Sequence, residues 1–145
     1  MPKIIWSEIL SVGNEEIDNQ HKRWIEIFNT SYDKMMCDDY SLLSNIGIDA
    51  LKQMMEYAQM HFEFEEKYMQ QINYPALVEH KFQHDLFKVQ LHKINQNFEN
   101  GISKLNSEIM KMIENWLIGH IQKEDQKYKI FITNLGNKDD SKSDL

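Results

Sequence analysis

Apolar residues recur at steps of three and four along most of this chain, and this spacing constrains the fold more than any other feature of the sequence. Such spacing places the apolar side chains on one face of an α-helix. Four segments show it, from about Val12 to Met35, from Leu42 to Ile72, from Pro75 to Phe98, and from Leu105 to beyond His120. Because the connections between them are short, neighbouring helices must run in opposite directions. The pattern predicts an all-α, antiparallel up-down four-helix bundle.

The limits of this bundle follow from the segments that lack the helical spacing. Residues 1–11 carry Trp6 and Leu10 on a short arm before the first helix. The stretch "CDDYS" separates the first two helices, "NYPAL" places Pro75 at the first position of the third, and "ENG" ends that helix with a glycine. We therefore expect one domain over residues 1–135 and a disordered polar tail over residues 136–145.

Composition limits the partners and the location that this chain can have. Its formal net charge of −7 disfavours nucleic acid and anionic membrane surfaces as partners. No run of about 18 apolar residues is present, so we expect no membrane span. The single cysteine, Cys37, cannot form an internal disulfide, and no long apolar segment opens the chain. These features predict a cytoplasmic protein.

Five of the six histidines lie on the apolar faces of the predicted helices. His80 and His84 are four residues apart, as are His61 and Glu65, so each pair shares one helix face. In an up-down bundle with a rise of about 1.5 Å per residue, the candidate metal ligands all fall roughly 8–21 Å from the same end. They are His21, His61, Glu65, His80, His84, His120 and an acid shortly after His120. Burying so many ionisable groups without a metal would cost several kcal/mol each, so the sequence predicts a metal centre.

The acid that follows His120 is ambiguous. Asp125 lies five residues after His120, which is about 140° around a regular helix, whereas Glu124 has the regular four-residue spacing. Either a π-type bulge brings Asp125 onto the face of His120, or Glu124 is the ligand, and helical geometry leaves both open. His92, the sixth histidine, lies two turns beyond His84, and we interpret it as lying outside the centre.

Five imidazoles and two carboxylates are too many ligands for one ion, so the sequence indicates two. A set of imidazoles and carboxylates without thiolate suits iron, manganese or zinc. Two six-coordinate ions offer about twelve positions, and five nitrogens, two bridging carboxylates and one bridging oxo or hydroxo group leave about one of them open. A single open position on a redox-active pair suits a small ligand such as O2.

Four motifs of this chain resemble those of the hemerythrin family. "SVGNEEIDNQH" ends at His21, "HFEFEE" contains His61 and Glu65, "HKFQH" contains His80 and His84, and "WLIGHIQKEDQKY" contains His120 and Asp125. The resemblance spans about residues 6–130 and is closer to the single-domain bacterial members than to the invertebrate carriers. It implies that Asp125, rather than Glu124, is the ligand.

The same resemblance implies two non-heme iron ions with a bridging oxo or hydroxo group. His80, His84 and His120 are expected to hold one ion, and His21 and His61 the other, which keeps the open position. Glu65 and Asp125 are expected to bridge the pair. We further expect Trp24, Phe62 and Trp116 to wall the O2 pocket, because they adjoin the ligand histidines in sequence.

The function expected from these features is reversible O2 binding for storage, delivery or sensing, without enzymatic activity. Nitric oxide and azide are further small ligands that such a site accepts, and a transient partner that receives O2 belongs to the same interpretation. The alternative is a di-iron enzyme, acting as a peroxidase, a nitric oxide reductase or a ferroxidase.

Overall fold

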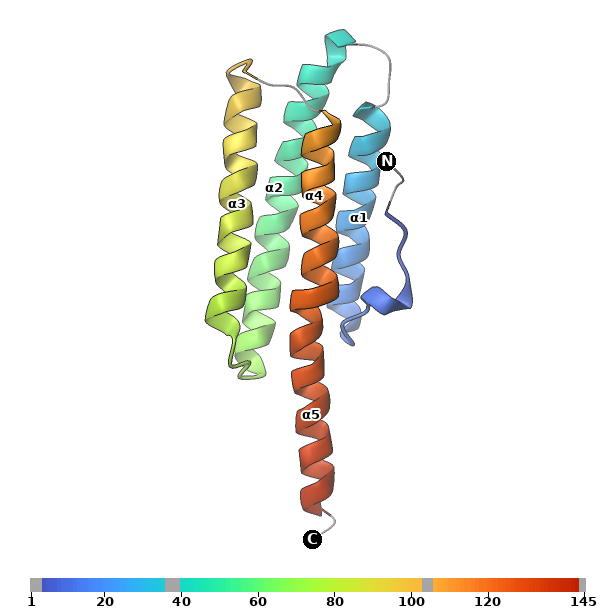
Figure 1. Cartoon of the computed structure of the whole chain (residues 1–145), viewed down its shortest axis with the longest axis vertical. Coiled ribbons are helices and arrows are strands. Elements are labelled where there is room, and N and C mark those ends of the chain that lie inside the picture. The colour runs from blue at the N-terminus through green and yellow to red at the C-terminus, as the bar shows by residue number, and fades with distance from the viewer. Residues whose placement is uncertain (1–3, 36–39, 103–105, 144–145) are drawn as a thin grey trace.

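The computed structural model describes residues 4–35, 40–102 and 106–143, and all regular structure within them is helical. The helices are α1 (Glu15–Met35), α2 (Tyr40–Gln71), α3 (Leu77–Glu99), α4 (Ser107–Gly119) and α5 (Asp125–Ser143), and a π-helical turn, η2 (His120–Glu124), joins α4 to α5. Helix α4, the turn η2 and helix α5 form one continuous helical rod, and α1, α2 and α3 are the other three rods. The four rods lie side by side, and each runs in the direction opposite to the one before it in the chain (Figure 1). The predicted all-α, antiparallel four-helix bundle is confirmed.

The predicted amino-terminal arm packs along α1 and contains a short 3-10 turn, η1 (Glu8–Leu10). Asn29 of α1 holds the arm at both backbone groups of Ile4, accepting from its N–H at 2.9 Å and donating to its carbonyl at 2.8 Å. Asp18 accepts a hydrogen bond from the Val12 N–H at 2.8 Å. This loop, with Gly13 at a φ of 79°, delays the start of α1 to Glu15, three residues later than the apolar spacing predicted.

The turn between α2 and α3 also differs from the sequence prediction. Asn73 adopts a left-handed conformation with a φ of 56° and ends α2. The Tyr74 N–H then donates to the Met69 carbonyl at 2.9 Å. Pro75 was expected at the first helical position, but it lies in the turn and α3 begins at Leu77. Gly101 does end α3 as predicted, with a φ of 70° that favours glycine.

The carboxyl-terminal rod is longer than the sequence indicated. Helix α5 continues to Ser143, past the predicted limit of the domain at residue 135, and projects beyond the other helices in Figure 1. Disorder of residues 136–145 stays a prediction, and residues 144–145 lie outside the described residues, as does Cys37. Within the described part of the chain, no helix is long and apolar enough to cross a membrane.

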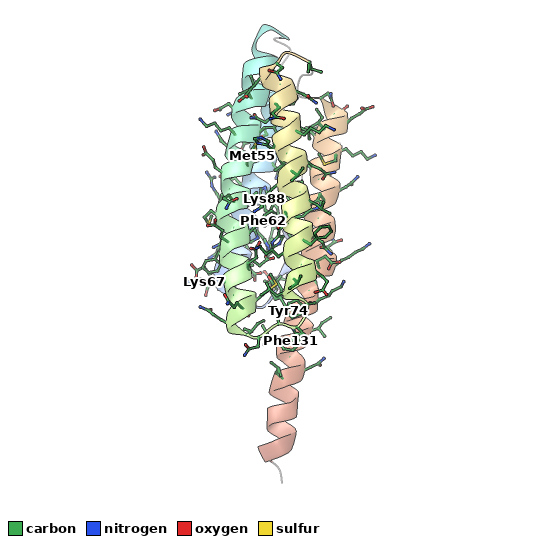
Figure 2. The ribbon with its side chains drawn as sticks, turned by 90° about the vertical axis from the view of Figure 1, so that its left-hand side faces the viewer. Met55, Phe62, Lys67, Tyr74, Lys88 and Phe131 are labelled. Carbon is green, nitrogen blue, oxygen red and sulfur yellow. The ribbon has the colours of Figure 1, made fainter. Side chains whose placement is uncertain are left out.

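Two apolar clusters fill the interior, and the histidines lie between them. The larger cluster includes Trp24, Phe62, Phe87 and Leu117, and the smaller one contains Tyr74 and Tyr128. Figure 2 shows Phe62 at mid-height of the bundle and Tyr74 with Phe131 near the end where α2 turns into α3. Packing on both sides therefore holds the histidine layer in place.

Candidate metal centre

The structure brings all seven predicted ligand residues together in one buried layer. Each rod contributes, with α1 supplying His21, α2 supplying His61 and Glu65, α3 supplying His80 and His84, η2 supplying His120 and α5 supplying Asp125. The most exposed of the seven is His120, at 6%, and five of them are fully buried. All seven side chains thus lie at one level of the bundle, and their role as metal ligands stays a prediction.

Glu65 occupies the middle of the layer and turns one oxygen to each side. Its Oε1 lies 2.9 Å from Nε2 of His80 and 3.2 Å from Nε2 of His84. Its Oε2 lies 3.2 Å from Nε2 of His61 and 3.5 Å from Nε2 of His21. A carboxylate placed in this way can bridge two ions.

Asp125 repeats this arrangement from the carboxyl-terminal rod. Its Oδ1 lies 3.0 Å from Nε2 of His80 and 3.1 Å from Nε2 of His120, whereas its Oδ2 lies 3.2 Å from Nε2 of His21. Glu65 therefore faces a group of three histidines (His80, His84, His120) and a group of two (His21, His61). Asp125 contacts His80 and His120 of the first group and His21 of the second.

Several buried polar atoms in this layer are placed in a way that fits metal ions better than hydrogen bonds within the cluster. Nε2 of His120 lies 3.0 Å from Nε2 of His80 and 2.9 Å from Nε2 of His84, and one N–H cannot serve both contacts. Nε2 of His21, Nε2 of His61 and both carboxylate oxygens of Asp125 have close neighbours, but within the described residues none of these contacts has the geometry of a hydrogen bond. Buried polar atoms are rarely left in this state, so the donor set fits metal ions.

The π turn η2 places the two acids that follow His120 in different surroundings. The Asp125 N–H donates to the carbonyl of His120, five residues earlier, which is the π-helical pattern. The widened turn brings Asp125 back to the side of His120. Glu124 instead forms an exposed ion pair with Lys127 at 3.1 Å. His92, also exposed, contacts Gln96 at 3.4 Å, away from the centre.

Three further residues contact the clustered side chains and were not found from the sequence. Oε1 of Gln20 lies 2.7 Å from Nδ1 of His61, and Oε2 of Glu66 lies 2.9 Å from Nδ1 of His84. The Tyr128 hydroxyl donates to Oε2 of Glu65 at 3.4 Å. The contacts of Gln20 and Glu66 cross between helices, which helical spacing within one segment cannot predict. Such partners fix the ring orientation of a metal-binding histidine.

Burial and the contacts between opposite charges shift the pKa values of the residues in this layer in opposite directions. Burial by itself lowers the pKa of His21, His80 and His120, but their contacts with Asp125 and Glu65 outweigh it and raise each pKa to about 9. Burial dominates for His61 and lowers its pKa. The histidine contacts hold the pKa of Glu65 and Asp125 below the usual carboxyl range despite burial. The metal-free layer therefore carries bound protons near neutral pH.

The three predicted pocket residues lie against the ligand histidines. Phe62 stacks on His84 with ring centroids 3.9 Å apart, and Trp116 stacks on His120 at 4.4 Å. Trp24 packs its edge against His61 at 5.6 Å. These rings also contact one another, since Phe62 lies 5.4 Å from Trp24 and 5.6 Å from Trp116. An aromatic wall thus covers one side of the histidine layer.

Comparison with known proteins gives this arrangement a family. The family model for the hemerythrin HHE cation-binding domain matches residues 12–131. This chain belongs to the hemerythrin family. That span contains the seven clustered residues, so the family resemblance noted in the sequence is confirmed.

Individual hemerythrins agree in both sequence and shape. The bacteriohemerythrin of Clostridium acetobutylicum is 29% identical over 125 residues, covering 86% of this chain and 97% of that protein. A hemerythrin-like protein of Naegleria gruberi is 28% identical, covering 86% of this chain and 89% of that protein. The crystal structure of a wild-type hemerythrin superposes with a TM-score of 0.80 at 26% identity, covering 88% of this chain and 96% of that one.

Proposed function

We propose that this hemerythrin binds O2 reversibly at a pair of non-heme iron ions joined by an oxo or hydroxo bridge. The observation that supports this most directly is the unequal division of histidines by the two carboxylates. Glu65 and Asp125 face both groups, but one group has three histidines and the other only two. With equal coordination numbers, the two-histidine side keeps one position for a small ligand.

In this proposal, His80, His84 and His120 hold one iron, His21 and His61 hold the other, and Glu65 with Asp125 bridges them. The iron pair, when bound, supplies the electrons that allow O2 to bind and leave. The protein fixes the ligand directions through the contacts of His61 with Gln20 and of His84 with Glu66.

Exclusion of water by the aromatic residues favours reversible binding. Trp24 and Phe62 are fully buried and pack against one another beside His61. We propose that they form the O2 pocket with Trp116, which stacks on His120. A dry pocket limits access of protons and water to the bound ligand, and these would otherwise convert the centre to a permanently oxidised form.

The physiological role is proposed as O2 storage, delivery or sensing, with a transient partner that receives O2. Nitric oxide and azide are expected to compete for the same position.

The decisive experiment is to record absorption spectra of the reduced, iron-loaded protein through repeated cycles of air and argon. Ligand-to-iron charge-transfer bands that appear in air and bleach under argon support the proposal. A single irreversible change to the oxidised spectrum would contradict the proposal and favour a di-iron enzyme. Turnover with hydrogen peroxide, nitric oxide or ferrous iron would then distinguish a peroxidase, a nitric oxide reductase and a ferroxidase.

A further inference from the structure

Helix α3 carries apolar side chains on its outer face as well as on its inner one. Val78, Phe82, Leu86 and Val89 are exposed by 78%, 61%, 51% and 65%. Their spacing of three and four residues places them in one stripe, on the side of the helix opposite His80 and His84. A helix that is apolar on both sides is typical of one that packs on both sides. The four side chains offer on the order of 400 Å² of apolar surface, the size of a functional patch.

This outer stripe of α3 forms a ridge between two grooves, on the side of the bundle that Figure 2 turns toward the viewer. The groove toward α4 has a volume of about 550 Å³ and is lined by Leu86, Val89 and Trp116, among others. The groove toward α2 has a volume of about 500 Å³, and its apolar lining includes Met55 and Val89. A surface with a ridge beside a groove can pack against a second copy of itself. A two-fold axis then places the ridge of each copy in the groove of the other.

The charges beside the stripe fit the same symmetry. Lys81 and Asp85 are one turn apart on one edge of the stripe, and Asp85 contacts Lys88 of its own helix at 3.3 Å in an exposed pair. If two copies of α3 pack antiparallel about an axis near residue 84, Phe82 faces Leu86 of the partner subunit. The same axis leaves Lys81 two residues, or about 3 Å along the helix, from the level of Asp85 of the partner subunit. A lysine side chain spans that offset, and symmetry makes the contact twice.

We propose that the outer face of α3 is a homodimer interface, in which two copies of this chain pack α3 against α3 in antiparallel orientation. A stable interface needs about 800 Å² from each partner, and the apolar stripe supplies roughly half of that, with the groove walls as the remainder. An area of this size, with charges at its edge, fits a dimer that dissociates on dilution rather than an obligate one.

The proposed dimer also covers the part of the histidine layer that is most exposed to water. The groove toward α4 is lined by His120 as well, the most exposed of the seven clustered residues. Packing a second copy over this groove removes the edge of His120 from water. This consequence rests on the proposed function, whereas the dimer itself does not.

Sedimentation velocity of the iron-loaded chain, over a concentration series from low to high micromolar, tests the interface. We expect the sedimentation coefficient to rise from that of a monomer to that of a dimer and to stop there. Phe82→Glu is expected to stay monomeric at every concentration. Ile5→Glu, which changes an equally apolar and more exposed residue on the arm, serves as the matched control and is expected to dimerise like the parent. Circular dichroism checks that each variant is folded.

Exchanging the two charges tests the antiparallel geometry separately from non-specific hydrophobic association. Lys81→Asp places two carboxylates at each of the two symmetric contacts and is expected to weaken dimerisation about tenfold. Adding Asp85→Lys restores opposite charges and is expected to recover the affinity. A parent chain that stays monomeric throughout, a Phe82→Glu variant that still dimerises, or an exchange that recovers nothing each overturns the proposal. A monomeric parent would leave the stripe to a different protein, whatever the outcome of the O2 experiment.

Discussion

His84 and His61 differ in the side chain that contacts the Nδ1 atom of each ring. Glu66 presents a carboxylate to Nδ1 of His84, whereas Gln20 presents a neutral amide oxygen to Nδ1 of His61. A carboxylate that accepts the Nδ1 proton makes the other nitrogen of the ring a stronger donor to a metal. We therefore expect the three-histidine side to bind its proposed ion more tightly than the two-histidine side.

Replacing Glu66 by Gln tests this difference. The variant keeps an acceptor oxygen but removes its charge, so we expect the affinity for one of the two ions to fall by roughly 10–100-fold. Competition titration with a chelator measures both affinities. Glu63→Gln, an exposed acid of the same helix, is the control and should bind both ions like the parent. Two unchanged affinities in the Glu66 variant would show that the contact is only structural.

Trp116 is the residue at which the aromatic wall meets solvent. It stacks on both His120 and Phe87 and lines the groove beside α3. In Trp116→Ala, water gains access to the edge of His120, and we expect the oxygenated form to decay several-fold faster in air. Trp116→Phe keeps an apolar ring in place and should decay at close to the parent rate. The decay of the charge-transfer absorption gives both rates, and an unchanged rate in the alanine variant would remove Trp116 from this role.

Among the elements, the π turn η2 contributes most to the geometry of the centre. Its five-residue hydrogen bond allows Asp125 to share a side with His120, although regular helical spacing would turn it away. In a regular α-helix the same side is reached after four residues, about 40° from the starting direction. The turn thus behaves as one additional residue within an otherwise regular helix.

Changing the length of this turn by one residue in each direction tests that interpretation. Deleting the exposed Lys123 gives a four-residue spacing, so we expect a regular helix that still places the aspartate beside His120 and binds two ions. Inserting an alanine after Lys123 rotates the aspartate away and is expected to reduce the bound metal to fewer than two ions. Metal analysis of both folded variants measures the outcome. Loss of metal in the deletion variant would mean that the π backbone itself is needed.

The elements also show which parts of the structure are open to sequence analysis. The apolar spacing predicted the helices and the level of the histidines, because both depend on repeats within one segment. The start of α1 and the position of Pro75 were wrong by two or three residues, because side-chain contacts such as that of Asp18 with Val12 set the helix ends. Gln20 and Glu66 escaped prediction because their partners lie on other helices.

For the whole molecule, the buried charges make stability depend on pH, and bound metal is expected to reduce that dependence. In the metal-free protein, the raised pKa values of His21, His80 and His120 mean that protonation of these residues stabilises the fold fully below their unfolded pKa near 6.5. This contribution is lost as the pH rises through about 9. Above that pH, two buried carboxylates remain without positive partners.

We therefore expect the melting temperature of the metal-free protein to fall by about 5 °C or more between about pH 7 and pH 10. Metal ions replace the protons as positive partners, so the zinc-loaded protein should change much less over the same range. Calorimetry of both forms measures the difference. A metal-free protein whose melting temperature rises over this range would contradict the charge arrangement described for the layer.

The π turn has one further consequence, for the way in which relatives of this protein are recognised. If the turn is equivalent to one inserted residue, a relative with a regular helix and a four-residue spacing directs its acid toward the same histidine. Searches that demand a fixed count between these two residues would then miss such lineages, and alignments would place a one-residue gap between positions 121 and 124.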